Sequence, residues 1–104
     1  MPQKEIAGVT IDVDDNGYMT NLDQWTKDIA TAFGKEVEIE ELTDKHWEVL
    51  DFLQENYKKG VALSIRKVGK SGIVDIKTLY KLFPGGPLKK SSLMAGIPKP
   101  ASCI

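Results

Sequence analysis

The sequence predicts a mainly α-helical protein with a small β-hairpin at its N-terminus, which is an α+β fold. A period of two in the apolar residues near the N-terminus predicts the hairpin, and repeats of three to four residues farther along predict helices. The 104 residues are 41% hydrophobic and 28% charged, a balance typical of one globular domain with a modest core. We therefore expect residues 1–96 to form one compact helical domain and residues 97–104 to form a flexible C-terminal arm.

The N-terminal hairpin is predicted over residues 5–20. Apolar and polar side chains alternate from residue 9 to residue 13, which is typical of a half-buried strand. Residues 7–8 are Ala-Gly and can close a first tight turn. Residues 14–17, Asp-Asp-Asn-Gly, predict a second turn because Asn and Gly tolerate a positive φ. Residues 18–19 then provide a short pairing strand.

Two longer helices are expected next, one over residues 22–33 and one between Thr43 and Gly60. Asn21 is a suitable N-cap for the first helix, and Gly34 fits the position just after it. Thr43 is a suitable N-cap for the second, which Gly60 ends after two lysines. The apolar faces consist of Leu22, Trp25, Ile29 and Phe33 in the first helix, and of Trp47, Leu50, Leu53 and Tyr57, widened by Val49 and Phe52, in the second.

Three shorter helices complete the prediction. The first covers residues 62–70, and a glycine turn over residues 69–72 separates it from a helix that starts near Asp75. Because two short helices joined by a glycine turn resemble a helix-turn-helix, we expect an element of that kind. Pro87 opens the last helix at its N1 position, and Gly96 ends it.

The aromatic residues on these helix faces are predicted to lie in the core; they are Trp25, Trp47, Tyr57, Tyr80 and Phe83. The single histidine, His46, lies in the first turn of the second long helix. A lone helical histidine is more often a surface or core-edge residue than a ligand. One cysteine and one histidine cannot build a structural zinc site of the Cys/His type.

The net charge of −1 conceals an asymmetry between the two halves of the chain. Residues 1–51 hold 4 basic and 13 acidic side chains, whereas residues 52–104 hold 10 basic and 2 acidic ones. Either the halves attract one another within the fold, or the basic half presents a surface to an anionic partner, protein or nucleic acid. The chain has no apolar run long enough for a membrane span and no secretory signal, so we expect a cytoplasmic protein without membrane contact.

Cys103 is the only cysteine and the only strong nucleophile candidate. It stands next to last, after Pro98 and Pro100, which favour an extended backbone. An arm of this length would reach roughly 30 Å, so its thiol could enter the active site of another protein. The alternative is an incidental terminal cysteine without a role.

Cations along the basic half could activate this thiol, since a nearby positive charge favours the thiolate. Lys99 is close in sequence, and a docked arm could also meet Arg66, Lys89 or Lys90, which would stabilise a thiolate or a persulfide anion. The alternative is that these cations are solvated or balance the acidic half.

The C-terminal segment closely resembles the ending of the DsrC/TusE family of sulfur-relay proteins. Residues 82–90 read Leu-Phe-Pro-Gly-Gly-Pro-Leu-Lys-Lys, and residues 95–104 read Ala-Gly-Ile-Pro-Lys-Pro-Ala-Ser-Cys-Ile. The family ending typically reads L-F-P-x-G-P-x-K and then A-G-[LI]-P-K-P-x-x-C-[VI]. Further matches extend the resemblance over nearly the whole chain; they are Asp15-Asn16-Gly17-Tyr18, Trp25, His46-Trp47, Tyr57, Arg66 and Tyr80-Lys81-Leu82-Phe83-Pro84.

The resemblance implies a mobile arm whose penultimate cysteine, here Cys103, carries sulfur as a persulfide. The chemistry would be that of a sulfurtransferase and would need no metal or organic cofactor. DsrC proper has a second arm cysteine eleven residues before the last one, where this sequence has Ser92. The resemblance therefore favours the single-cysteine, TusE-like branch. Such a carrier accepts sulfur from donor proteins of the TusBCD/DsrEFH type and passes it toward tRNA 2-thiouridine synthesis.

Two other functions stay open on the sequence. A DsrC-like accessory gamma protein would bind dissimilatory sulfite reductase and insert its arm near the catalytic centre. A DNA-binding regulator would use residues 62–83 as a helix-turn-helix, with the basic half facing phosphates. Its recognition helix would hold few base-reading side chains, namely Asp75, Lys77 and Thr78, so direct nucleic-acid binding is not expected.

Overall fold

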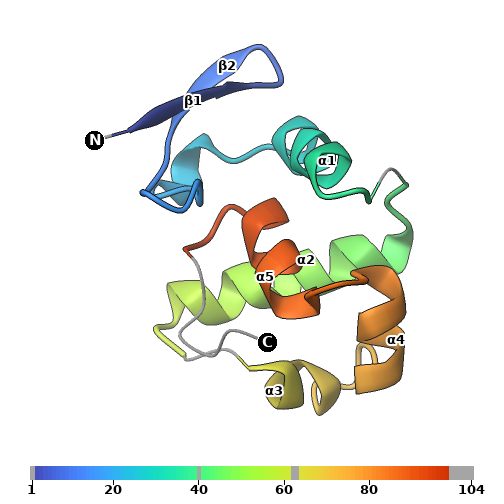
Figure 1. Cartoon of the computed structure of the whole chain (residues 1–104). Coiled ribbons are helices and arrows are strands. Elements are labelled where there is room, and N and C mark those ends of the chain that lie inside the picture. Colours follow the sequence, from blue (N-terminus) through green and yellow to red (C-terminus); the bar gives the residue numbers. More distant parts are fainter. Residues whose placement is uncertain (1, 40, 62–63, 99–104) are drawn as a thin grey trace.

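The computed structural model describes residues 2–39, 41–61 and 64–98, and these form a hairpin followed by helices (Figure 1). The elements are β1 (Gln3–Ile6), β2 (Val9–Asp12), the 3-10 helix η1 (Leu22–Gln24), α1 (Lys27–Glu36), α2 (Asp44–Lys58), α3 (Ile65–Gly69), α4 (Ile76–Leu82) and α5 (Pro87–Met94). The predicted class, mainly α with an N-terminal hairpin, is confirmed. Within the described ranges, no helix combines the length and the apolar character that a membrane crossing requires.

The hairpin forms as predicted. β1 and β2 pair antiparallel around a turn in which Ala7 has a φ of 52° and Gly8 a φ of 79°. In the second turn, Oδ1 of Asp14 accepts hydrogen bonds from two backbone N–H groups of the following residues. The chain thereby reverses, so that Val13 pairs with Met19 and both side chains are buried.

The predicted helix over residues 22–33 is wrong at both ends. Asn21 caps only the short helix η1. The chain then becomes extended at Trp25, which has a ψ of 139°, and Trp25 donates its indole Nε1–H to the carbonyl oxygen of Met94 at 2.7 Å. Helix α1 begins only after Thr26, whose hydroxyl accepts a backbone N–H of the first turn. A tertiary contact therefore divides a segment whose apolar spacing predicts one helix.

Gly34 lies inside α1 and does not end it, contrary to the prediction. The helix continues to Glu36, and the left-handed residue after it is Glu38, with a φ of 67°. A Cβ at residue 34 would lie 2.6 Å from the carbonyl oxygen of Ile39. The glycine is needed because the returning chain packs directly against the helix, where the N–H of Ile39 donates to the carbonyl of Gly34 at 2.7 Å.

The remaining predicted helix boundaries agree closely with the structure. Thr43 precedes α2, and Gly60 follows its end with a φ of 73°. The side chain of Asp75 caps α4, and Pro87 is the first residue of α5. Helix α3 begins at Ile65, and residues 62–63, where the sequence placed its start, lie outside the described ranges.

Helix α5 lies at the centre of the fold and contacts α1, α2 and α4 (Figure 1). The hairpin and α1 lie on one side of it, and α3 and α4 lie on the other. Of the five aromatic residues predicted to be core, Phe83 is fully buried, and Trp25 and Trp47 are partly buried. The prediction is wrong for Tyr57 and Tyr80, whose side chains are 42% and 43% exposed.

Candidate functional site

The arm root, which we define as residues 94–98, is the part of the candidate site that the structure describes. Helix α5 ends at Met94, and Gly96 turns the chain with a φ of 75°. Ile97 is buried, and its N–H donates to the carbonyl of Ser92 at 3.2 Å. Pro98 is partly buried. The packed part of the chain thus extends through Ile97, which the sequence assigned to the arm.

Two side chains from distant segments hold the arm root. Trp25 donates its indole N–H to the carbonyl of Met94, and Gln54 of α2 donates its side-chain N–H to the carbonyl of Ala95, both at 2.7 Å. The last carbonyls of a helix have no partner within the helix, so these bonds satisfy groups that would otherwise be buried without one. The root is therefore fixed from two directions.

Only glycine fits at the turn of the arm root. A Cβ at residue 96 would lie 2.5 Å from Cδ1 of Trp25 and 3.1 Å from Sδ of Met19. The φ of 75° also lies in the left-handed region, which side chains with a Cβ disfavour. Gly96, predicted from the sequence only as a helix stop, thus also allows the close approach of the indole ring.

Ser92 lies inside the core and not on the arm. Its Oγ is fully buried, and among the described residues it is the one such side-chain atom without a hydrogen-bond partner. The neighbouring Ser91 is equally buried, but its hydroxyl donates to the carbonyl of Leu88 at 3.2 Å. The residue that replaces the second cysteine of DsrC proper is therefore enclosed in the fold.

Three of the predicted site residues, Cys103, Lys99 and Pro100, lie outside the described residues. Arg66 is exposed on α3. Pro98 ends the described chain at the arm root itself.

The two lysines of α5 have different surroundings. Lys90 extends to the end of α1, where its Nζ donates to the carbonyl of Val37 at 3.1 Å, so it ties α5 to α1. The side chain of Lys89 is exposed, while its carbonyl accepts a hydrogen bond from the hydroxyl of Tyr18 at 3.2 Å. Of these two lysines, Lys89 is the one with an exposed side chain, and it lies on α5, the helix that leads into the arm.

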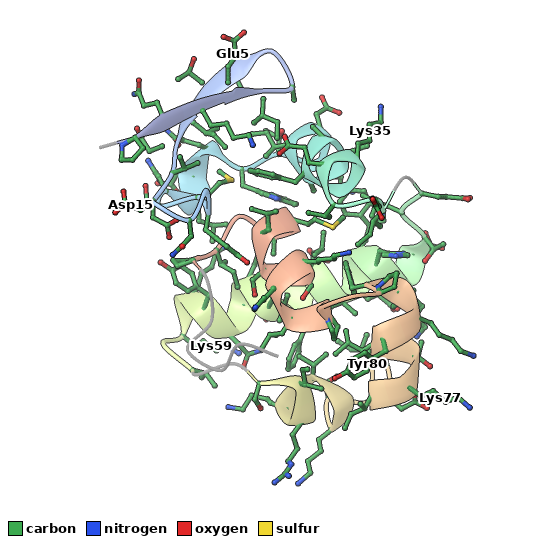
Figure 2. All side chains as sticks on the ribbon, in the orientation of Figure 1. Glu5, Asp15, Lys35, Lys59, Lys77 and Tyr80 are labelled. Atoms are coloured by element: carbon green, nitrogen blue, oxygen red, sulfur yellow. The ribbon has the colours of Figure 1, made fainter. Side chains whose placement is uncertain are left out.

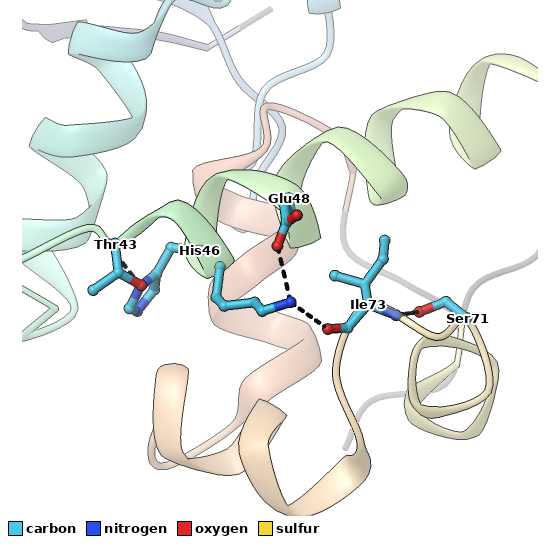
Figure 3. A network of polar contacts seen from close by, with 6 residues as sticks. Thr43, His46, Glu48, Ser71 and Ile73 are labelled. Atoms are coloured by element: carbon cyan, nitrogen blue, oxygen red, sulfur yellow. Dashed lines mark hydrogen bonds and ion pairs between the residues drawn. The ribbon is translucent and has the colours of Figure 1, made fainter.

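His46 is a buried structural residue at the start of α2 (Figure 3). Its Nδ1 accepts the backbone N–H of Thr43 at 3.0 Å, so the proton of the neutral ring is on Nε2, which donates to the carbonyl of Leu82 at 2.9 Å. The ring also makes an edge contact with Phe83. Both ring nitrogens are engaged within the fold, and the histidine is not available as a ligand.

The described ranges contain no group of three His, Cys, Asp or Glu side chains that could hold a metal ion. Sequence reasoning missed two residues of the site, Trp25 and Gln54, as anchors of the arm root. A signal existed for Gln54, because it follows Leu50 by four residues and so interrupts an apolar helix face with a polar side chain. Trp25 has two signals, its place on a predicted apolar face and its match to the family, and neither predicts a bond to Met94.

Comparisons of the sequence with known proteins all indicate the same family. The family model described as "DsrC like protein" matches residues 5–104. The chain is 33% identical to the dissimilatory-type sulfite reductase gamma subunit of Nitratidesulfovibrio vulgaris, over 100% of both chains. It is 38% identical to the sulfurtransferase TusE of Photorhabdus laumondii, over 93% of this chain and 94% of the relative.

The structural comparison agrees. The NMR structure of Allochromatium vinosum DsrC matches with a TM-score of 0.78 and 36% identity, over 98% of this chain and 97% of that chain. These names give no support to a DNA-binding regulator. The sequence match over the full length and the shared fold lead to the same conclusion: the chain belongs to the DsrC-like family of sulfur carriers.

Proposed function

We propose that this chain is a TusE-like sulfur carrier, which accepts persulfide sulfur on Cys103 and passes it on toward tRNA 2-thiouridine synthesis. The observation that carries this proposal is the terminal sequence Pro-Lys-Pro-Ala-Ser-Cys-Ile in a member of a sulfur-carrier family. The chain has no other cysteine, so every thiol step falls to Cys103.

The proposed step is an exchange at sulfur without net oxidation or reduction. The thiolate of Cys103 attacks the outer sulfur of a donor persulfide, R–S–SH, and forms a new S–S bond. The bond between the two donor sulfurs breaks, and its electron pair leaves with the donor as the thiolate R–S⁻. The proton stays on the transferred sulfur, so Cys103 becomes Cys103–S–SH. The same exchange, with Cys103 as the donor, delivers the sulfur to an acceptor.

The arm root supports this proposal from the structural side. A carrier must present its sulfur to two partners in turn, which requires a defined point from which the arm departs. The bonds from Trp25 to the carbonyl of Met94 and from Gln54 to the carbonyl of Ala95 fix that point. The partners we propose are donor proteins of the TusBCD/DsrEFH type and, downstream, a tRNA-thiolating enzyme in the cytoplasm.

A second function, that of a sulfite reductase gamma subunit, is favoured by one observation. The chain aligns over its full length with the gamma subunit of Nitratidesulfovibrio vulgaris. Ser92 weighs against this function, because a hydroxyl cannot form the disulfide of a two-cysteine cycle, and its position is enclosed in the core. Stable copurification of the chain with a sirohaem enzyme from its own host would favour the gamma-subunit role.

A reconstituted relay tests the carrier function. The purified chain is incubated with a persulfide-loaded donor, an acceptor enzyme and tRNA, and thiolated tRNA is measured. We expect transfer by the native chain and none by Cys103→Ser. The control Ser102→Ala changes the neighbouring hydroxyl and should transfer sulfur at the native rate. Full transfer by Cys103→Ala would overturn the proposal.

A further inference from the structure

The outer side of helices α3 and α4 carries a dense positive charge that the fold itself does not use. Residues 64–82 hold five cations and one carboxylate, that of Asp75. All five cations are exposed, and none forms an ion pair with another described residue; they are Arg66, Lys67, Lys70, Lys77 and Lys81. We call this surface, together with the apolar residues described next, the α3–α4 face.

Two large apolar side chains are exposed on α4, the helix that also carries Lys77 and Lys81. Ile76 and Tyr80 are 44% and 43% exposed and stand four residues apart on α4, so they are neighbours on one side of the helix. Lys77 and Lys81 follow each of them by one residue. Ile76 also packs against Gly69 of α3: a Cβ added at residue 69 would lie 2.6 Å from Cγ1 of Ile76. This contact joins α4 to α3. An apolar centre within a polar rim is the usual layout of a protein interface.

The α3–α4 face is held in one arrangement by α2 (Figure 3). Ahead of α4, Nζ of Lys45 donates to the carbonyl of Ile73 at 3.0 Å and forms an ion pair with Glu48 at 3.2 Å. At the other end of α4, the ring of His46 donates to the carbonyl of Leu82. Because both ends are fixed, a partner would not have to order this helix on binding.

We propose that the α3–α4 face docks onto an acidic surface of the protein that donates sulfur, with Tyr80 as the central contact and the cations around it. This inference rests on the proposed carrier function and adds a second contact to the one made by the arm. Tyrosine and arginine are enriched where interfaces lose most affinity on truncation. Unpaired cations raise the rate of encounter with an acidic protein.

Charge favours the donor over the acceptor. An enzyme that thiolates tRNA must itself present cations to RNA phosphates, and it would repel this face. The face also suits a protein better than a nucleic acid. The carboxylate of Asp75 is occupied by the backbone N–H of Thr78 at 2.7 Å, and the centre of the face is apolar. Of the three side chains that could read bases, that of Asp75 is thereby part of the helix cap.

The test measures the affinity of the purified TusBCD/DsrEFH-type complex, encoded in the same genome, for the full chain labelled at its N-terminus. Two matched charge reversals are compared, Lys77→Glu and Lys35→Glu. Both lysines are exposed, and they lie well apart, Lys35 on α1 in the upper half of the view and Lys77 on α4 in the lower half (Figure 2). A third variant, Tyr80→Ala, removes the aromatic contact.

We expect Lys77→Glu and Tyr80→Ala each to weaken binding by about tenfold or more, and Lys35→Glu by less than about twofold. Higher salt should weaken binding of the native chain and narrow the gap between the two charge variants. Equal affinities for all four proteins, or no binding by the native chain, would overturn the docking surface. Tight binding to tRNA or duplex DNA that Lys77→Glu removes, with donor affinity unchanged, would overturn it in favour of a nucleic acid.

The carrier function and the docking surface fail separately. Transfer of sulfur to Cys103 at native rates by Tyr80→Ala and Lys77→Glu would leave the carrier function intact and overturn the docking surface. A native chain that bound the donor with the expected variant pattern, but gained no sulfur on Cys103, would overturn the carrier function alone.

Discussion

The arm root and the α3–α4 face differ in how far the chain satisfies its own groups. At the root, the carbonyls of Met94 and Ala95 have side-chain partners, and Ile97 is buried. At the face, five cations lack ion pairs within the described chain, and Tyr80 is half-exposed. The arm root therefore holds the chain in place, whereas the α3–α4 face has charged and apolar groups that a partner could contact. Substitutions at the root should therefore lower stability, whereas those at the face should lower binding.

The largest expected loss of stability follows Gly96→Ala. Its Cβ would meet the ring of Trp25, which adds about 1–3 kcal/mol of overpacking to about 1–2 kcal/mol for the left-handed backbone. Gly72→Ala is the matched control, because Gly72 has a φ of 86° but open space around its Cα. Urea unfolding followed by circular dichroism should show a clearly larger loss for Gly96→Ala. Equal losses would mean that the indole contact does not constrain the root.

Trp25→Phe tests the hydrogen bond to the root. The ring remains aromatic, but the carbonyl of Met94 loses its partner, so we expect a loss of about 1–3 kcal/mol in the free energy of unfolding. Tyr80→Phe, on the α3–α4 face, removes a polar group from a half-exposed ring and should change stability by less than about 0.5 kcal/mol. If thermal unfolding showed a larger loss of stability for Tyr80→Phe than for Trp25→Phe, the assignment of stability to the root and of binding to the face would be contradicted.

Two adjacent serines of α5, just before the arm root, offer a smaller and opposite effect on stability. Ser92→Ala removes a buried hydroxyl without a partner and should raise the free energy of unfolding by about 1 kcal/mol. Ser91→Ala removes a hydroxyl that donates to Leu88 and should leave stability unchanged or lower it. Urea midpoints of the two variants give the comparison. A loss of stability in Ser92→Ala would show that its hydroxyl has a partner.

The smallest effect concerns the α3–α4 face. The backbone N–H of Thr78 lowers the pKa of Asp75 below its ordinary value of 3.8, with Lys77 and Lys81 contributing less. A lowered folded-state pKa stabilises the protein above that ordinary value, and the contribution is lost as the pH falls through the folded pKa. Asn caps helices as well as Asp, so Asp75→Asn isolates the charge. We expect its melting temperature to fall slightly below the native one near pH 7 and to converge with it in acid; a gap independent of pH would contradict this.

The sequence predicts those elements whose boundaries are set locally. The turn at residues 7–8, the cap at Thr43 and the start of α5 at Pro87 each follow from the conformational preference of one or two residues. The sequence does not predict features set by tertiary contact. The break at Trp25 depends on a carbonyl 69 residues away, and the place of Gly34 depends on the returning chain.

The candidate site divides in the same way. The terminal motif predicts that Cys103 is the sulfur carrier, and Ser92 indicates the single-cysteine branch. Both predictions need only the type of residue at one position. The bonds that Trp25 and Gln54 make could not be predicted, because periodicity assigns a side chain to a face without showing which carbonyl it meets. Tyr80 was predicted to be core for the same reason: the spacing that places it near Leu79 and Phe83 does not tell the edge of a helix face from its middle.

The most direct test of the carrier function is the mass of Cys103 itself. The native chain and Cys103→Ser are incubated with a persulfide donor, and peptide mass spectrometry locates any added sulfur. We predict one added sulfur atom on the C-terminal peptide of the native chain, removed by a thiol reductant, and none on the variant. An unmodified Cys103 after full discharge of the donor, or the same gain of sulfur in Cys103→Ser, would contradict the account.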